Sequence, residues 1–164
     1  MIPLRRVLLI GAVALVVYAL DRVTKSWVVA EIPLNTSREI VDGWVHVANV
    51  RNTGAAFGLL PERTSLLSIL SVVAVLVILY YYRTLAARSA PIAATLGMQL
   101  GGAAGNLVDR VGQGYVVDFV DAGIPGGWRF WAFNVADSSI VVGIGLVTLL
   151  LWLEERKQAR AAAA

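Results

Sequence analysis

The aspartate at position 137 stands at the start of a long apolar stretch. Residues 138–153, SSIVVGIGLVTLLLWL, carry no charged side chain, and with its flanks this stretch is long enough to cross a bilayer as a helix. An ionised carboxyl group costs about 2.5–3.5 kcal/mol at the centre of a membrane on insertion scales, and less toward the interface. If the chain from Trp131 is helical, Asp137 lies about 9 Å below that residue. A carboxyl group kept at this depth is a candidate for chemistry.

Other polar residues fall near the ends of the apolar stretches. Asn134 and Asp137 are three residues apart, and Asn106 and Arg110 are four apart, so each pair shares one face of a helix. The topology described below places the whole set toward one membrane surface. A solute carrier should instead have polar groups near the midplane, so this distribution indicates a pocket at one surface. The set comprises Asp21, Arg22, Lys25, Asn52, Asn106, Asp109, Arg110, Asp118, Asn134 and Asp137.

Two carboxyl groups that face one water molecule can hydrolyse a peptide bond. Because like charges at close range do not both ionise readily, the pair shares a proton. One group is then the general base for water, and the protonated group polarises the carbonyl and later donates to the leaving amine. Asp118 and Asp137 are the acids without an evident basic partner. They are the candidate catalytic pair, and this reaction needs no cofactor.

Each polar residue also has a structural interpretation. A lone aspartate in a membrane helix can pair with Lys25 or Arg110 and stabilise the bundle. Asp21 and Lys25, four residues apart, are expected to form such a structural pair. Asp109 beside Arg110 is consistent with a solvated helix cap.

Nucleophile and metal chemistries have weaker support. Ser138 and Ser139 follow Asp137, but no motif places a histidine to activate them, and a lysine-assisted serine would need Lys25 from another helix. The chain has no cysteine and one histidine, His46, in a strand-like stretch. This composition excludes thiolate chemistry and disulfides and argues against a transition-metal centre. We therefore expect neither a metal nor a cofactor.

The elements that position these residues are predicted to be membrane helices. The chain is 58% hydrophobic and 15% charged, with a mean hydropathy of +0.72, which is outside the usual composition of a soluble domain. The predicted fold is an all-α integral membrane protein of four transmembrane helices with a small extracytoplasmic β-element. Residues 1–164 should form one membrane domain, with spans at about 5–28, 64–83, 89–109 and 132–153 and outer loops at about 29–63 and 110–131.

Basic residues set the predicted orientation. They are densest in the two ends of the chain and in the short turn at 83–88, so both termini and this turn should be cytoplasmic and the longer loops outside. The formal charge of +3 fits such anchoring charges, and no basic stripe indicates a nucleic-acid partner. The β-branched stretch WVHVANV at 44–50 predicts a short outer strand, and the second loop has room for a brief strand or surface helix near 115–121.

Five motifs resemble those of the lipoprotein signal peptidases (signal peptidase II, bacterial aspartic membrane proteases). They are DRVTK at 21–25, NTGAAF at 52–57, GGAAGNLVDR at 101–110, VVDF at 116–119 and FNVAD at 133–137. The motifs occur in the order of that family, at comparable spacings, over nearly the whole chain. Arg22 falls at a position that the family fills variably.

The resemblance implies an aspartic endopeptidase of the bacterial cytoplasmic membrane, with its site near the outer face. The implied substrate is a prolipoprotein, cut on the amino side of a cysteine that carries diacylglycerol, with the lipid chains among the helices. Membrane lipids are the other expected partners, and a monomer is expected. The implied catalytic residues are Asp118 and Asp137, the substrate-binding residues Asn52, Gly54, Asn106, Arg110 and Asn134, and the supporting polar residues Asp21, Lys25 and Asp109.

Two other classes are also considered. A carrier that binds an ion at Asp137 would need polar residues that continue to the cytoplasmic side, and FGLL at 57–60 and VGIGLVTLLL at 142–151 do not supply them. A scaffold protein, in which the acids only pair with Lys25 and Arg110, predicts that Asp118→Asn and Asp137→Asn lower stability without affecting any activity.

Overall fold

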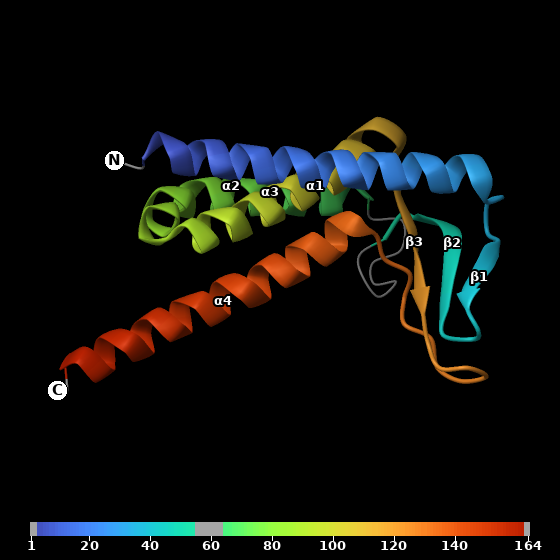
Figure 1. Ribbon diagram of the computed structural model, residues 1–164. Helices are drawn as coiled ribbons and strands as arrows, with labels where there is room; N and C mark the ends of the chain where they lie inside the picture. The colour runs from blue at the N-terminus through green and yellow to red at the C-terminus, as the bar shows by residue number, and fades with distance from the viewer. Residues whose placement is uncertain (1–2, 55–63, 163–164) are drawn as a thin grey trace.

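The computed structural model describes residues 3–54 and 64–162 as four helices and a three-stranded sheet (Figure 1). The helices lie alongside one another, and the sheet stands across one end of them, opposite the end where the two termini lie. Positions 55–57 of the NTGAAF motif and the FGLL stretch lie outside the described residues. In chain order the elements are α1 (Leu4–Glu31), β1 (Ser37–Val41), β2 (Val45–Asn52), α2 (Thr64–Arg88), α3 (Ala90–Gln113), β3 (Val116–Ala122) and α4 (Val135–Ala162).

Three helices in the described part of the chain are long and apolar enough to cross a membrane: Leu4–Glu31, Ile69–Arg88 and Val135–Ala162. Most of their side chains in the apolar stretches are exposed on the protein, as expected where lipid replaces water as the solvent. The chain is therefore an integral membrane protein. It is mostly helical, and the predicted small β-element is present as a sheet of three strands.

The remaining helix, α3, is the central one and packs against α1, α2 and α4. It begins after the N-cap Ser89, whose hydroxyl accepts from the Ile92 N–H, and it ends at Gly114, whose φ of 80° only glycine adopts readily. Close approach depends on small residues: a Cβ at Gly101 would lie 2.5 Å from the Ala14 carbonyl oxygen of α1. A Cβ at Gly102 would lie at the same distance from the Ala136 carbonyl oxygen of α4.

The sheet has the antiparallel order β1-β2-β3 and so joins the two outer loops. Val50 pairs with Asp118 and Asn52 with Val116, after an irregularity in the register of β2. Val117 and Phe119 of β3 pack against Val28 of α1, which attaches the sheet to the helices. The strand predicted at 44–50 is confirmed, and the segment near 115–121 is a strand rather than a surface helix.

Candidate active site

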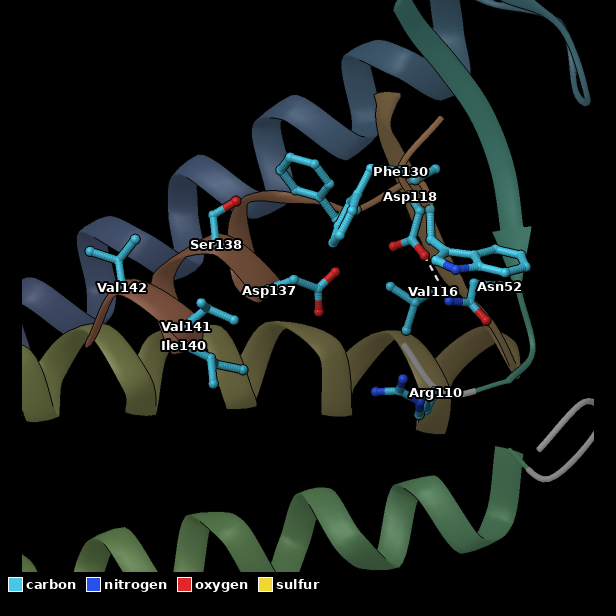
Figure 2. Close-up of a pocket in the computed structure, with 13 residues that line it drawn as sticks. Asn52, Arg110, Val116, Asp118, Phe130, Asp137, Ser138, Ile140, Val141 and Val142 are labelled. Carbon is cyan, nitrogen blue, oxygen red and sulfur yellow. Dashed lines mark hydrogen bonds between the residues drawn. The ribbon is translucent and has the colours of Figure 1, made fainter. Parts of the chain in front are cut away.

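A cavity of about 470 Å³ lies between the sheet, α3 and the first turns of α4 (Figure 2). Most of its lining is apolar, from Val116, from the aromatic segment 130–133 and from 140–142 on α4. Asp118 and Asp137 approach each other across it. The other polar lining residues are Asn52, Arg110 and Ser138.

Asp118 is buried on β3, with 3% of its surface exposed. Its Oδ2 accepts from Asn52 Nδ2 at 2.7 Å and its Oδ1 accepts from Asn134 Nδ2 at 2.6 Å. Burial, and then the negative charge of Asp137, raise the pKa of the Asp118 carboxyl to about 7, although the two amide donors oppose the shift. A carboxyl group with this pKa can carry a proton near neutral pH.

Asp137 belongs to a capping box at the start of α4. Asn134 Oδ1 accepts from the Asp137 N–H at 2.9 Å, and Asp137 Oδ2 accepts in return from the Asn134 N–H at 3.2 Å. Asn106 Nδ2 donates to the other oxygen, Oδ1, at 2.7 Å. The N-terminus of a helix also stabilises a nearby negative charge. Both oxygens of the Asp137 carboxyl group therefore accept hydrogen bonds, which hold it in one orientation.

Backbone donors fix how two of the asparagines face the acids. Asn52 Oδ1 accepts from the Gly54 N–H at 2.8 Å, so its NH₂ group must point toward Asp118. Asn134 is held in the same way by the Asp137 N–H and is fully buried. Each of the four carboxyl oxygens of Asp118 and Asp137 thus accepts one hydrogen bond.

A buried group of charged residues lies behind this pair. Lys25 Nζ donates to Asp21 Oδ2 and Asp109 Oδ2, both at 2.7 Å, and to Asn106 Oδ1 at 3.0 Å. Arg22 also pairs with Asp109. The predicted pair of Asp21 and Lys25 is confirmed. Asp109 is not a solvated cap, because the close packing of α1 on α3 leaves it only 2% exposed.

The alternative in which the catalytic candidates only form structural ion pairs finds no support in the described residues. There, no salt bridge joins Asp118 or Asp137 to a basic side chain. Lys25 is occupied by other acids, and Arg110 lines the cavity with its buried Nε free of any hydrogen bond among the described atoms.

The structure places the other sequence-predicted residues in two positions relative to the cavity. Asn52 and Arg110 line it, whereas Asn106 and Asn134 contact the carboxyl groups from behind and Gly54 orients Asn52.

Sequence reasoning missed two features of the site. The first is the aromatic lining of the cavity at 130–133, from Phe130, Trp131 and Phe133. The second is Asp21 Oδ1, which accepts from the Ala136 N–H at 2.9 Å and so caps α4 from α1. No local pattern in the sequence signals this contact.

Apolar helices and a paired-aspartate cavity at one end of them define an integral membrane protein with an aspartate-based site. Residues 13–153 match the family model described as signal peptidase (SPase) II. The chain belongs to the signal peptidase II family and is an aspartic peptidase. The carrier and scaffold alternatives are thereby set aside.

Curated relatives and solved structures agree with this assignment. The chain is 40% identical over 146 residues to a lipoprotein signal peptidase of Halothermothrix orenii, which covers 88% of this chain and 95% of the relative. It is 41% identical over 147 residues to that of Symbiobacterium thermophilum, with coverages of 88% and 94%. A bacterial membrane enzyme solved by the in meso method at 2.3 Å superposes with a TM-score of 0.76 at 29% identity, over 88% of this chain and 87% of that one.

Proposed function

We propose that Asp118 and Asp137 form the catalytic pair with which this peptidase removes the signal peptides of bacterial lipoproteins. The observation that carries the proposal is the placement of the two carboxyl groups, each held by two hydrogen bonds, on one largely apolar cavity. Family membership supplies the reaction class, and the curated relatives are lipoprotein signal peptidases. The substrate is a prolipoprotein cut on the amino side of its diacylglyceryl cysteine.

The surroundings of the two acids support different roles for them. Asp137 at the helix N-terminus is the charged general base, and Asp118, whose pKa is about 7, carries the proton. Asp137 removes a proton from water as the water oxygen bonds to the scissile carbonyl carbon, while Asp118 donates a hydrogen bond to the carbonyl oxygen. The carbon–nitrogen bond of the tetrahedral intermediate then breaks, and the departing amine takes up a proton from the pair.

The remaining lining residues bind the substrate around this reaction. Arg110 Nε has no hydrogen-bond partner among the described residues, so it is available to donate to a carbonyl oxygen of the substrate backbone. Asn52, Asn106 and Asn134 hold the acids in place. The apolar wall from 140–142 suits the acyl chains of the modified cysteine.

The arrangement in the membrane completes the proposal. The central helix α3 is the fourth span, beside the three apolar helices, and the chain is a monomer forming a single membrane domain. Both termini lie on the cytoplasmic side of the bacterial cytoplasmic membrane. The sheet stands at the opposite end of the helices from the termini (Figure 1), and the cavity lies beside it. Both lie at the outer face of the membrane, where the signal peptide of an exported protein is accessible.

A cleavage assay in detergent tests this function. Full-length wild type, Asp118→Asn and Asp137→Asn are incubated with a prolipoprotein in its lipidated and unlipidated forms, and cleavage is followed by gel shift. Asp42→Asn, at an exposed position between β1 and β2, is the matched control. We expect wild type and the control to cut only the lipidated form, and both dyad variants to be inactive yet folded. Turnover by both dyad variants would refute the catalytic assignment.

A further inference from the structure

The side chain of Asn106 connects Lys25 on α1 to Asp137 on α4. Asn106 Oδ1 lies 3.0 Å from Lys25 Nζ, and Asn106 Nδ2 lies 2.7 Å from Asp137 Oδ1. Lys25 and Asn106 are only 2% and 5% exposed. Water is therefore excluded from the Lys25–Asn106 bond, and the amide is a direct link between the ammonium group and the carboxylate on the cavity.

The direction of this link is set mainly by Lys25, whose bond to Asn106 Oδ1 is 3.0 Å, with a longer contact of 3.4 Å from Asn134 Nδ2 to the same oxygen. An ammonium group has three donors and no acceptor, and all three are used, by Asp21, Asp109 and Asn106. The amide oxygen of Asn106 must therefore face Lys25, and its NH₂ group must face Asp137. A flipped amide would place two donors against each other. Asp137 Oδ1 consequently accepts a hydrogen bond, which is the bond that favours an ionised carboxylate.

We propose that Lys25 is a positioning residue for the reaction: it holds Asn106 in one orientation and thereby keeps Asp137 charged and directed into the cavity. This inference rests on the catalytic role proposed above for Asp137. It goes beyond the structural ion pair expected from the sequence, because the effect passes through a neutral side chain and acts on proton transfer rather than on folding alone.

Arg22, a second cation in the same group, distinguishes two possible effects of Lys25: orienting the Asn106 amide, and adding a positive charge near Asp137. The Arg22 guanidinium pairs with Asp109 and has no hydrogen bond to Asn106 among the described residues. Arg22→Met therefore removes a positive charge without releasing the amide. The charged groups around Asp137, taken over the elements packed against it, are Asp118 on β3, Arg110 and Asp109 on α3, and Asp21, Arg22 and Lys25 on α1.

The test is the pH dependence of kcat and KM for cleavage of a lipidated prolipoprotein by the full-length protein in detergent. In Lys25→Met, a flipped Asn106 can present its oxygen to Asp137. The acidic limb of the profile, which is the range where activity falls as the pH is lowered, should therefore move up by about one pH unit. kcat on this limb should fall about tenfold, with KM within about twofold of wild type. Arg22→Met should keep the wild-type limb. In an Asn106→Leu background, Lys25→Met should cause no further movement.

Two further variants keep the test decisive if Lys25→Met unfolds. Lys25→Met combined with Asp109→Asn removes one charge of each sign and should show the same movement of the limb. Lys25→Arg keeps a charged donor and should restore the wild-type limb. The inference is refuted by a wild-type limb in folded Lys25→Met or by an equal movement in Arg22→Met. If Asp137→Asn is inactive in that case, only this inference fails, whereas an active Asp137→Asn would refute the proposed catalytic role of Asp137, on which the inference rests.

Discussion

Asp118→Asn should be more stable than wild type at about pH 8 and less stable than wild type at about pH 4. Burial, and then the charge of Asp137, raise the pKa of Asp118 to about 7, whereas the unfolded carboxyl titrates near 3.8. Between these values the folded protein holds a proton that the unfolded chain has released. The free energy of unfolding of wild type therefore falls as the pH rises through this range.

The size of the effect follows from the difference between the folded and unfolded pKa values. A difference of about three pH units corresponds to about 4 kcal/mol, at about 1.36 kcal/mol per unit. An asparagine side chain at this position does not titrate, so the pH-dependent loss should disappear in Asp118→Asn. The amide places a donor against Asn52 or Asn134, which costs about 1–2 kcal/mol at every pH. The variant should be the less stable protein at about pH 4 and the more stable one at about pH 8.

Thermal unfolding followed by tryptophan fluorescence in detergent measures this difference. About 4 kcal/mol corresponds to roughly 8–16 °C in Tm for a chain of this size, so the change in Tm between the two pH values should differ clearly between wild type and Asp118→Asn. Asp42→Asn should follow wild type, because Asp42 is exposed. Parallel curves of Tm against pH for wild type and Asp118→Asn would refute the reasoning. Lost cleavage by the stabilised variant would show that stability is given up for catalysis.

Three further predictions follow from the packing and chemistry of the site. Asn134→Ala should lower the free energy of unfolding by at least about 1 kcal/mol through loss of the α4 cap, whereas Asn134→Asp should keep the cap. Both variants should fail in the cleavage assay, because neither side chain donates to Asp118 as the amide does. Gly105→Ala should lower Tm by several degrees because its Cβ would lie 2.6 Å from Asp21 Oδ2, whereas Gly112→Ala, with open space on the same helix, should not. Chelators should leave cleavage unchanged, since no group of acids and histidines in the described residues could hold a metal; inhibition reversed by zinc would contradict the mechanism.

The apolar helices could be predicted from the sequence because hydropathy is a local property. Each uncharged stretch reports the cost of transferring that segment into lipid, and α1, α2 and α4 contain the stretches predicted as spans. The strand at 44–50 was equally local, through its β-branched residues. Asp137 followed from similar reasoning, since a carboxyl group at the start of an apolar helix is costly unless it has a function, and Asp118 was the other acid without an evident basic partner.

The pairing of strands from different loops could not be predicted from the sequence. β3 joins β2 although the two strands come from different outer loops, and this pairing brings Asn52 to Asp118. The sequence allowed either a strand or a surface helix near 115–121, because a few residues with β-branched side chains do not show where a partner strand lies. The result is a sheet that forms one wall of the cavity.

The sequence by itself indicated which segments are apolar enough to enter the membrane, the family of the protein and the candidate acids of its site. Only the tertiary structure decided which donor faces which acceptor: that Lys25 holds the oxygen of Asn106, that Asp21 caps α4, and that Asp109 is buried. These contacts depend on the close approach of α1 and α4 to the glycines of α3. Such an approach is set by packing between distant segments, and hydropathy and motif spacing carry no information about the direction of a hydrogen bond.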